Sequence, residues 1–421
     1  MIVFLFLTFF VLIFLNVPIA FALGISSLAY FIISGDFVLT LLPQTMFKAL
    51  DSFPLMAAPF FILAGKLMEH GGISKRLIAF AQSIVGQLKG GLAHVGVITC
   101  MFFAALSGSA SATTAAIAGL LVPSMVKAGY DRSFSTAVTA AAGTTGIMIP
   151  PSVPLIIYGV TASVSVSDLF IAGIVPGVLV GLSFMLVCYI ISVLKDYKTS
   201  EKTSVRKIII SFKESFLALL MPIIILGGIY GGIFTPTEAS VVAVVYGFVI
   251  GAFVYKELNI AAFKEIFVSS AVTSSVILLL ISTASIFGTI LTREQIPHSV
   301  ATFIADSALS DIGIILLVNL LLLLVGTFME TIAAIIILTP LLVPVITGTG
   351  MDPVHFGIIM IVNLAIGLIT PPVGVNIFVG TQVGRVPYES LVKALLPFLL
   401  MMIIDLLLIT FIPSISLFFV K

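Results

Sequence analysis

Charge is what this sequence has least of. Only 9% of its 421 residues are charged and 60% are hydrophobic, whereas roughly a quarter of the residues in an ordinary soluble domain are charged. This balance excludes a soluble globular protein. The formal net charge of +1 gives no indication of a nucleic-acid partner.

Residues that carry covalent or metal chemistry are also scarce. The two cysteines, Cys100 and Cys188, lie in apolar stretches without disulfide or metal spacing, and the four histidines are scattered. The sequence contains no HExxH motif, no GxSxG motif and no paired acidic residues within an apolar stretch. We therefore expect no enzymatic activity and no organic cofactor.

Long apolar runs fill most of the chain. A membrane-spanning helix needs about 20 apolar residues, whereas barrel strands would alternate apolar and polar residues. We predict an all-α polytopic membrane protein, whose first segment is a retained span because it lacks a basic start and a cleavage site. The expected spans are 2–17, 18–34, 53–70, 133–162 and 169–194 in one half, and 216–234, 236–255, 267–291, 355–383 and 390–418 in the other.

The most charged stretch separates the two halves. Residues 195–215 are predicted to be a basic cytoplasmic linker between a first half, 1–194, and a second half, 216–421. Sixteen lysines and arginines, Lys66 among them, then lie on the cytoplasmic side and three outside. This asymmetry follows the positive-inside rule and places both termini outside. Residues 73–89 have helical apolar spacing, which fits either an arm helix along the membrane surface or an ordinary loop helix.

Two stretches, 94–128 and 312–347, have apolar arms around a short polar break. The arm 94–106 has 13 residues, or about 20 Å of helix, too short for a hydrocarbon core of about 30 Å. We predict re-entrant hairpins whose tips, SGSAS (107–111) and GTFMET (326–331), line a polar cavity or lie buried in protein. For SGSAS the alternative is a stripe of small residues that packs two helices together.

Each hairpin is followed by a span with a double-proline break. The breaks are GIMIPPSVP (146–154), within a broken helix at 133–162, and GLITPPVG (367–374), within a broken helix at 355–383. A shift of 221 positions superimposes them, with nine identities over 54 residues. An odd number of crossings per half makes the repeats inverted. Inverted repeats with discontinuous helices are typical of secondary transporters, and the breaks mark the binding site.

The breaks also suggest which chemistry is present. Proline frees a helix carbonyl, which is costly in the membrane unless something uses it. A sodium ion prefers such oxygens, and helix N-termini favour an anion. No arginine lies at either break, so helix ends, hydroxyls and amides are expected to hold the anion. Candidate substrate contacts are Ser109, Thr145, Glu330, Asn363 and Asn376.

Some of these polar residues have a second interpretation. Asn363 and Asn376 fit hydrogen bonds to the freed backbone as well as contacts to substrate or ion, and Glu330 fits a structural or an ion-site group. Glu238, in FTPTEAS, is predicted to cap a helix start. Asp405, in the last span, has no assigned role.

Five motifs together resemble one transporter family. DSFPLMAAPFFILAGKLM (51–68), the SGSASAT tip, GIMIPPSVPLIIYG (146–159), GIFTPTEAS (232–240) and GLITPPVGVNIF (367–378) resemble the large membrane (M) subunit of tripartite ATP-independent periplasmic (TRAP) transporters, of the ion transporter superfamily. The resemblance covers essentially the whole chain. It implies an elevator-type, sodium-coupled importer of an organic anion such as sialic acid or a C4-dicarboxylate, in the bacterial inner membrane, with both termini periplasmic.

The resemblance also implies partners and ion sites. A separate small four-helix membrane subunit and a periplasmic substrate-binding protein are expected, with two or more Na⁺ ions. A stand-alone carboxylate symporter or a sodium/proton antiporter of the same superfamily is the alternative. Sodium site 1 would comprise Ser107, Gly108, Ser109, Ser111, Gly146 and Pro150, and site 2 Gly326, Thr327, Thr331, Gly367 and Thr370. The bulkier second tip suggests that the two sites differ.

Overall fold

A computed structural model of the chain describes residues 1–35, 38–197, 204–305 and 310–420. All regular structure in these ranges is helical, which confirms the predicted all-α class. Seven of the described helices are long and apolar enough to cross a membrane, or eight if the bent pair Leu41–Leu50 and Pro54–His70 counts as one span. Residues 198–203 of the predicted linker lie outside the described residues.

The first half contains ten α-helices and two short helical turns in its described residues. They are α1 (Ile2–Phe14), α2 (Ile19–Ser34), α3 (Leu41–Leu50), η1 (Pro54–Met56), α4 (Ala57–His70), α5 (Ile73–Val85), α6 (Gly91–Ser107), α7 (Ala110–Lys127), α8 (Arg132–Gly143), η2 (Thr144–Ile147), α9 (Val153–Ala162) and α10 (Val166–Leu194).

The described second half contains ten more α-helices and one π-helical turn. They are α11 (Val205–Tyr230), α12 (Pro236–Val249), η3 (Ile250–Val254), α13 (Ile260–Arg293), α14 (Ile296–Ala305), α15 (Asp311–Gly326), α16 (Thr331–Gly348), α17 (Pro353–Gly367), α18 (Val375–Gly384), α19 (Tyr388–Phe411) and α20 (Ser414–Leu417).

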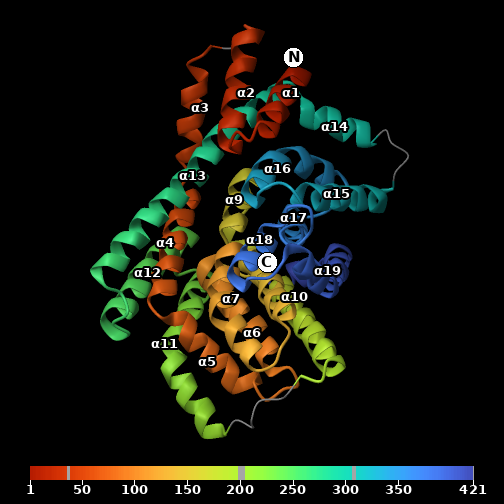
Figure 1. Ribbon diagram of the computed structural model, residues 1–421. Helices are drawn as coiled ribbons and strands as arrows, with labels where there is room; N and C mark the ends of the chain where they lie inside the picture. Colours follow the sequence, from red (N-terminus) through yellow and green to blue (C-terminus); the bar gives the residue numbers. More distant parts are fainter. Residues whose placement is uncertain (36–37, 198–203, 306–309, 421) are drawn as a thin grey trace.

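These helices form two groups, each drawn from both halves of the chain. We call α1–α4 with α11–α13 the side layer, in which α4 packs against α12 and α13, and α13 against α2 and α3. We call α6–α10 with α15–α19 the hairpin body. Within it, α6 and α7 lie low in Figure 1, α15 and α16 lie high, α17 and α18 lie between them, and α9 lies beside α16. The helix α5 joins the groups by packing against both α6 and α11.

The helix bounds repeat along the chain. Moving α7 by 221 positions gives the bounds of α16, 331–348, and moving the start of α8 gives the start of α17, 353. Asp131 and Asp352, also 221 apart, cap α8 and α17 with their carboxylates. The repeat seen in the sequence is therefore also a repeat of helix starts and helix ends.

Several boundaries differ from the sequence prediction. The helix α11 begins at Val205, inside the predicted linker 195–215, because Ser204 caps it by accepting from the Lys207 N–H (3.3 Å). The helices α3 and α14 were not expected. The first hairpin arm, α6, has 17 residues rather than 13, so its length of about 25 Å alone does not rule out a crossing. The evidence for a hairpin is instead the break after Ser107 and the packing of α6 against α7.

The predicted arm at 73–89 is α5, which ends at Val85. Its apolar side chains Ile73, Leu77 and Phe80 are buried. Since α5 packs against α6 and α11, this part of the predicted face points into the protein, whereas Ile84 and Leu88 of the same face are exposed.

Candidate functional site

The first hairpin tip is held by its own hydroxyls. Gly108 ends α6 with a φ of +60°, a left-handed conformation that glycine adopts without strain. Ser109 then caps α7, its Oγ accepting from the Ala112 N–H (3.4 Å). Ser107 Oγ and Thr113 Oγ1 lie 2.7 Å apart, and Thr113 Oγ1 donates to the Ser109 carbonyl (2.7 Å). Several oxygens therefore gather within one turn.

The first break packs directly against this tip. The break comprises η2 and the residues up to Ser152, including the cis bond Pro150–Pro151. A Cβ atom on Gly146 would lie 2.5 Å from the Ser109 carbonyl oxygen. One on Gly108 would lie 3.0 Å from the Pro151 carbonyl oxygen. The backbone of the first tip therefore lies directly against the backbone of the first break, which brings the residues predicted for sodium site 1 to one place.

The second tip repeats this contact with a different cap. Gly326 ends α15, and a Cβ atom on Gly367 would overlap the Gly326 backbone. Glu330 caps α16, its Oε2 accepting from the N–H groups of Ile332 (2.9 Å) and Ala333 (3.1 Å). Under the 221-residue shift, Glu330 occupies the position of Ser109. The same capping position thus holds a hydroxyl in one half and a carboxylate in the other.

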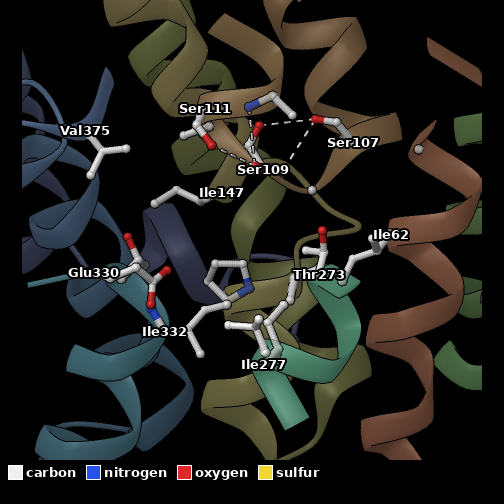
Figure 2. Close-up of a pocket in the computed structure, with 18 of the residues that line it drawn as sticks. Ile62, Ser107, Ser109, Ser111, Ile147, Thr273, Ile277, Glu330, Ile332 and Val375 are labelled. Atoms are coloured by element: carbon white, nitrogen blue, oxygen red, sulfur yellow. Dashed lines mark hydrogen bonds between the residues drawn. The ribbon is translucent and has the colours of Figure 1, made fainter. Parts of the chain in front are cut away.

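Both tips open into one cavity of about 810 Å³ between the hairpin body and the side layer. Figure 2 shows Ser107, Ser109 and Ser111 at one end of this space and Glu330 at another, with Thr273 of α13 across from them. The volume is in the range typical of small-molecule sites. The predicted site residues that line the cavity are Ser107, Gly108, Ser109, Ser111, Glu330 and Thr331.

Other predicted residues lie behind this lining. The hydroxyls of Thr145, Thr327 and Thr370 each donate to a carbonyl three or four residues earlier in the chain, at 2.7–2.8 Å. They satisfy local backbone groups and stand outside the lining of the cavity. Gly146, Gly326 and Gly367 contribute backbone packing rather than cavity surface, and Pro150 also stands outside the cavity lining.

The two asparagines are used inside the hairpin body. Asn363 Nδ2 donates to Asn319 Oδ1 (2.7 Å) and to the Ile359 carbonyl (2.9 Å). Asn376 Nδ2 donates to the Ala140 carbonyl (3.1 Å), which ties α18 to α8. Asn376 thus bonds a carbonyl near the end of α8, whereas Asn363 bonds a neighbouring side chain and its own helix. Neither side chain lines the cavity, and the buried Oδ1 atoms of both have no hydrogen-bond partner among the described residues.

Two charged residues on α4 also line the cavity, and no sequence motif pointed to them. Lys66 and Glu69 line the cavity one helical turn apart, and Lys66 Nζ donates to Thr273 Oγ1 (3.4 Å). Lys66 lies within α4, inside the predicted span 53–70, and its place on the cavity lining was not expected from its count among the cytoplasmic basic residues. The available signal was a lysine in the apolar run FFILAGKLM, since ionisable residues inside spans are usually functional.

Two other acidic residues have structural partners. The predicted cap at Glu238 is confirmed: its Oε2 accepts from the Thr235 N–H (2.8 Å), and Thr235 Oγ1 accepts from the Glu238 N–H. The buried Asp405 accepts from Ser183 Oγ (2.8 Å), which links α19 to α10.

The sequence profile of the tripartite ATP-independent periplasmic transporter, DctM component, matches residues 6–415. The chain belongs to this family. It is therefore a TRAP transporter large membrane subunit, as the motifs indicated, and its relatives are transport permeases rather than enzymes. The family and the apolar helices make it a multi-pass protein of the bacterial inner membrane.

Curated relatives of this DctM-family chain carry different substrate names. It is 47% identical over 96% of its length to the isethionate TRAP transporter permease protein DctMQ of Oleidesulfovibrio alaskensis, and covers 64% of that longer protein. It is 43% identical to the C4-dicarboxylate TRAP transporter large permease protein DctM of Pseudomonas aeruginosa, covering 94% of this chain and 93% of the relative. It is 40% identical to the sialic acid TRAP transporter large permease protein SiaM of Vibrio cholerae, covering 96% and 95%.

Solved structures share the fold at low identity. The Alcanivorax borkumensis YdaH transporter superimposes with a TM-score of 0.67 at 16% identity, covering 89% of this chain and 88% of the other. Neisseria gonorrhoeae MtrF gives a TM-score of 0.60 at 13% identity, covering 88% and 83%. At these identities the likeness concerns the fold alone.

Proposed function

We propose that this subunit imports an organic acid by sodium-coupled, elevator-type transport through the cavity between the hairpin body and the side layer. The observation that carries the proposal is the shared cavity, lined by Ser107–Ala112 of one tip and Glu330–Ile332 of the other. A substrate bound there contacts both repeats and the side layer at once. Movement of the hairpin body along the side layer would then carry it across the membrane.

The tips supply the oxygen ligands that sodium requires. At the first tip, hydrogen bonds bring oxygen atoms close together. The Ser109 carbonyl accepts from the Ser107 and Thr113 hydroxyls, and the Ser109 hydroxyl contacts that of Ser111. At the second tip, Glu330 Oε2 accepts two backbone N–H groups, so the other carboxylate oxygen can face a cation. Sodium, like other hard cations, is held by neutral and charged oxygens of this kind.

Two partners complete the proposed system. A periplasmic binding protein would deliver the substrate, and a small membrane subunit would pack against the permease, in line with the names of the relatives. The three named substrates of the relatives, isethionate, C4-dicarboxylates and sialic acid, are organic acids. We infer the same class for this chain.

The test is uptake into proteoliposomes that hold this chain with its small subunit, with the binding protein added outside. Radiolabelled isethionate, sialic acid and succinate are supplied with an inward sodium gradient. Uptake should need both the gradient and the binding protein. Uptake that persists without the sodium gradient would refute the coupling. Uptake that needs neither partner would favour the stand-alone symporter instead.

A further inference from the structure

We propose that Lys66 binds the acid group of the substrate, and that the cavity selects organic acids with one negative charge over those with two. This inference rests on the proposed function, since it assigns a residue and a charge class to the same cavity. The charged side chains that face the cavity, among the described lining residues, are Lys66, Glu69 and Glu330.

Lys66 is placed to meet an anion. It projects from α4 of the side layer, and the preceding residue, Gly65, lies against the end of the first hairpin arm: a Cβ atom there would be 2.9 Å from the Leu106 carbonyl oxygen. The Lys66 ammonium lies at Thr273 of α13, on the wall of the cavity that the first tip also lines. Its hydrogen bond to Thr273 Oγ1, at 3.4 Å, leaves other N–H groups of the ammonium available. A substrate held at the tip can accept one of them.

The carboxylates of Glu69 and Glu330 limit how much negative charge a bound substrate can carry. Glu69 follows Lys66 by three residues, so both side chains lie on the cavity face of α4. With one sodium ion at each tip, as proposed above, the Lys66 ammonium and two sodium ions stand against the carboxylates of Glu69 and Glu330, which leaves a formal charge of +1 on the loaded cavity. A monoanion that pairs with Lys66 brings this charge to zero. A dianion places its second charge in the same cavity without a second ammonium among the described lining residues, and like charges at short range in a site of low dielectric repel strongly.

The experiment must separate the cavity from the binding protein, which selects substrates before delivery. Equilibrium binding of radiolabelled isethionate, sialic acid and succinate is therefore measured on the purified permease with its small subunit in lipid nanodiscs, in sodium buffer. Isethionate and sialic acid carry one negative charge at neutral pH, and succinate carries two. Wild type should bind at least one of the monoanions about tenfold more tightly than succinate.

Variants at α4 then test the role of Lys66. K66M should weaken monoanion binding about tenfold or more, because a hydrogen bond to a charged group is lost. K66R, which keeps the charge, should retain most of the affinity. E69Q removes one carboxylate and should narrow the preference for monoanions over succinate. The matched control is K127M, at an exposed lysine in the last turn of α7, which should bind like wild type.

These measurements distinguish failure of the inference about Lys66 from failure of the proposed function. Unchanged monoanion affinity in K66M, or succinate bound as tightly as both monoanions by wild type, would overturn the inference and leave the proposed function standing. Failure of wild type to bind any of the three acids, together with absent uptake in proteoliposomes, would overturn both.

Discussion

The two hairpin tips reach the same cavity with different chemistry. The first is short and neutral: a two-residue break at Gly108 and Ser109, where the capping hydroxyl of Ser109 contacts the Ser111 hydroxyl. The second is longer and charged: residues 327–330 connect the arms, Phe328 is exposed, and Glu330 supplies the cap. Since helix N-termini accept either a hydroxyl or a carboxylate as cap, the repeat preserves the backbone geometry and leaves the charge free to vary.

The two halves share some residues at the tip and the break and differ in others. Both halves require a glycine where the break meets the tip, namely Gly146 and Gly367, because backbone contacts backbone there. The capping residue is permitted to differ. Substitutions at the glycines should therefore have similar effects in the two halves, and substitutions at the caps should have different ones.

The largest effect is expected at the shared glycines. G146V and G367V should each reduce sodium-driven uptake to less than about a tenth of wild type, because a side chain at either position overlaps the backbone of its tip, and overpacking typically costs at least 1–3 kcal/mol. Uptake is measured in proteoliposomes at matched protein content. The control is G288V, since a Cβ atom on Gly288 of α13 meets nothing within 4 Å.

Thermal unfolding of the two glycine variants sharpens this test. Both proteins should remain folded and lose stability by similar amounts. Strong loss of uptake in only one of the two variants would show that the two breaks do not pack against their tips in the same way.

The glycines also show how far the sequence could lead. A double proline preceded by glycine, repeated 221 residues later, was sufficient to locate both breaks. The family resemblance grouped each break with its tip, and the close backbone contacts at Gly146 and Gly367 agree with that grouping. The side-layer contribution of Lys66 could not be derived this way. It depends on how α4 packs beside the first tip, which no periodicity within either segment encodes.

The asparagines illustrate a different limit. Their cost in an apolar span was evident, yet sequence alone left two uses open. The partners of Asn363 and Asn376, Asn319 and the Ala140 carbonyl, lie 44 and 236 residues away in the chain. Tertiary packing therefore supplies partners for the amide N–H groups, while the buried Oδ1 atoms of both asparagines have no hydrogen-bond partner among the described residues. The start of α11 likewise depends on a single capping serine, Ser204.

The second effect concerns the charge at the second tip. E330S makes the two caps alike: a hydroxyl retains the helix cap while the carboxylate is lost. If this carboxylate holds a cation, the sodium concentration for half-maximal uptake should rise about tenfold, since hydrogen bonds and contacts to charged groups contribute roughly 1.5–3 kcal/mol. The control is E389S, an exposed glutamate in the first turn of α19. An unaltered sodium dependence in E330S would assign Glu330 a purely structural role.

The smallest effect is expected at the first tip, where the capping bond of Ser109 is long. S109A should lower the free energy of unfolding by about 1 kcal/mol through loss of the cap. S204A removes a cap of similar length, 3.3 Å, at the start of α11, where the side chain does not line the cavity. Both costs are measured by denaturant or thermal unfolding, first in choline buffer, where S109A also loses the 3.4 Å contact with Ser111 Oγ. In sodium buffer, the difference between the two costs should grow, because only Ser109 would also lose an ion contact. A difference that is the same in both buffers would show that the Ser109 hydroxyl is not a sodium ligand.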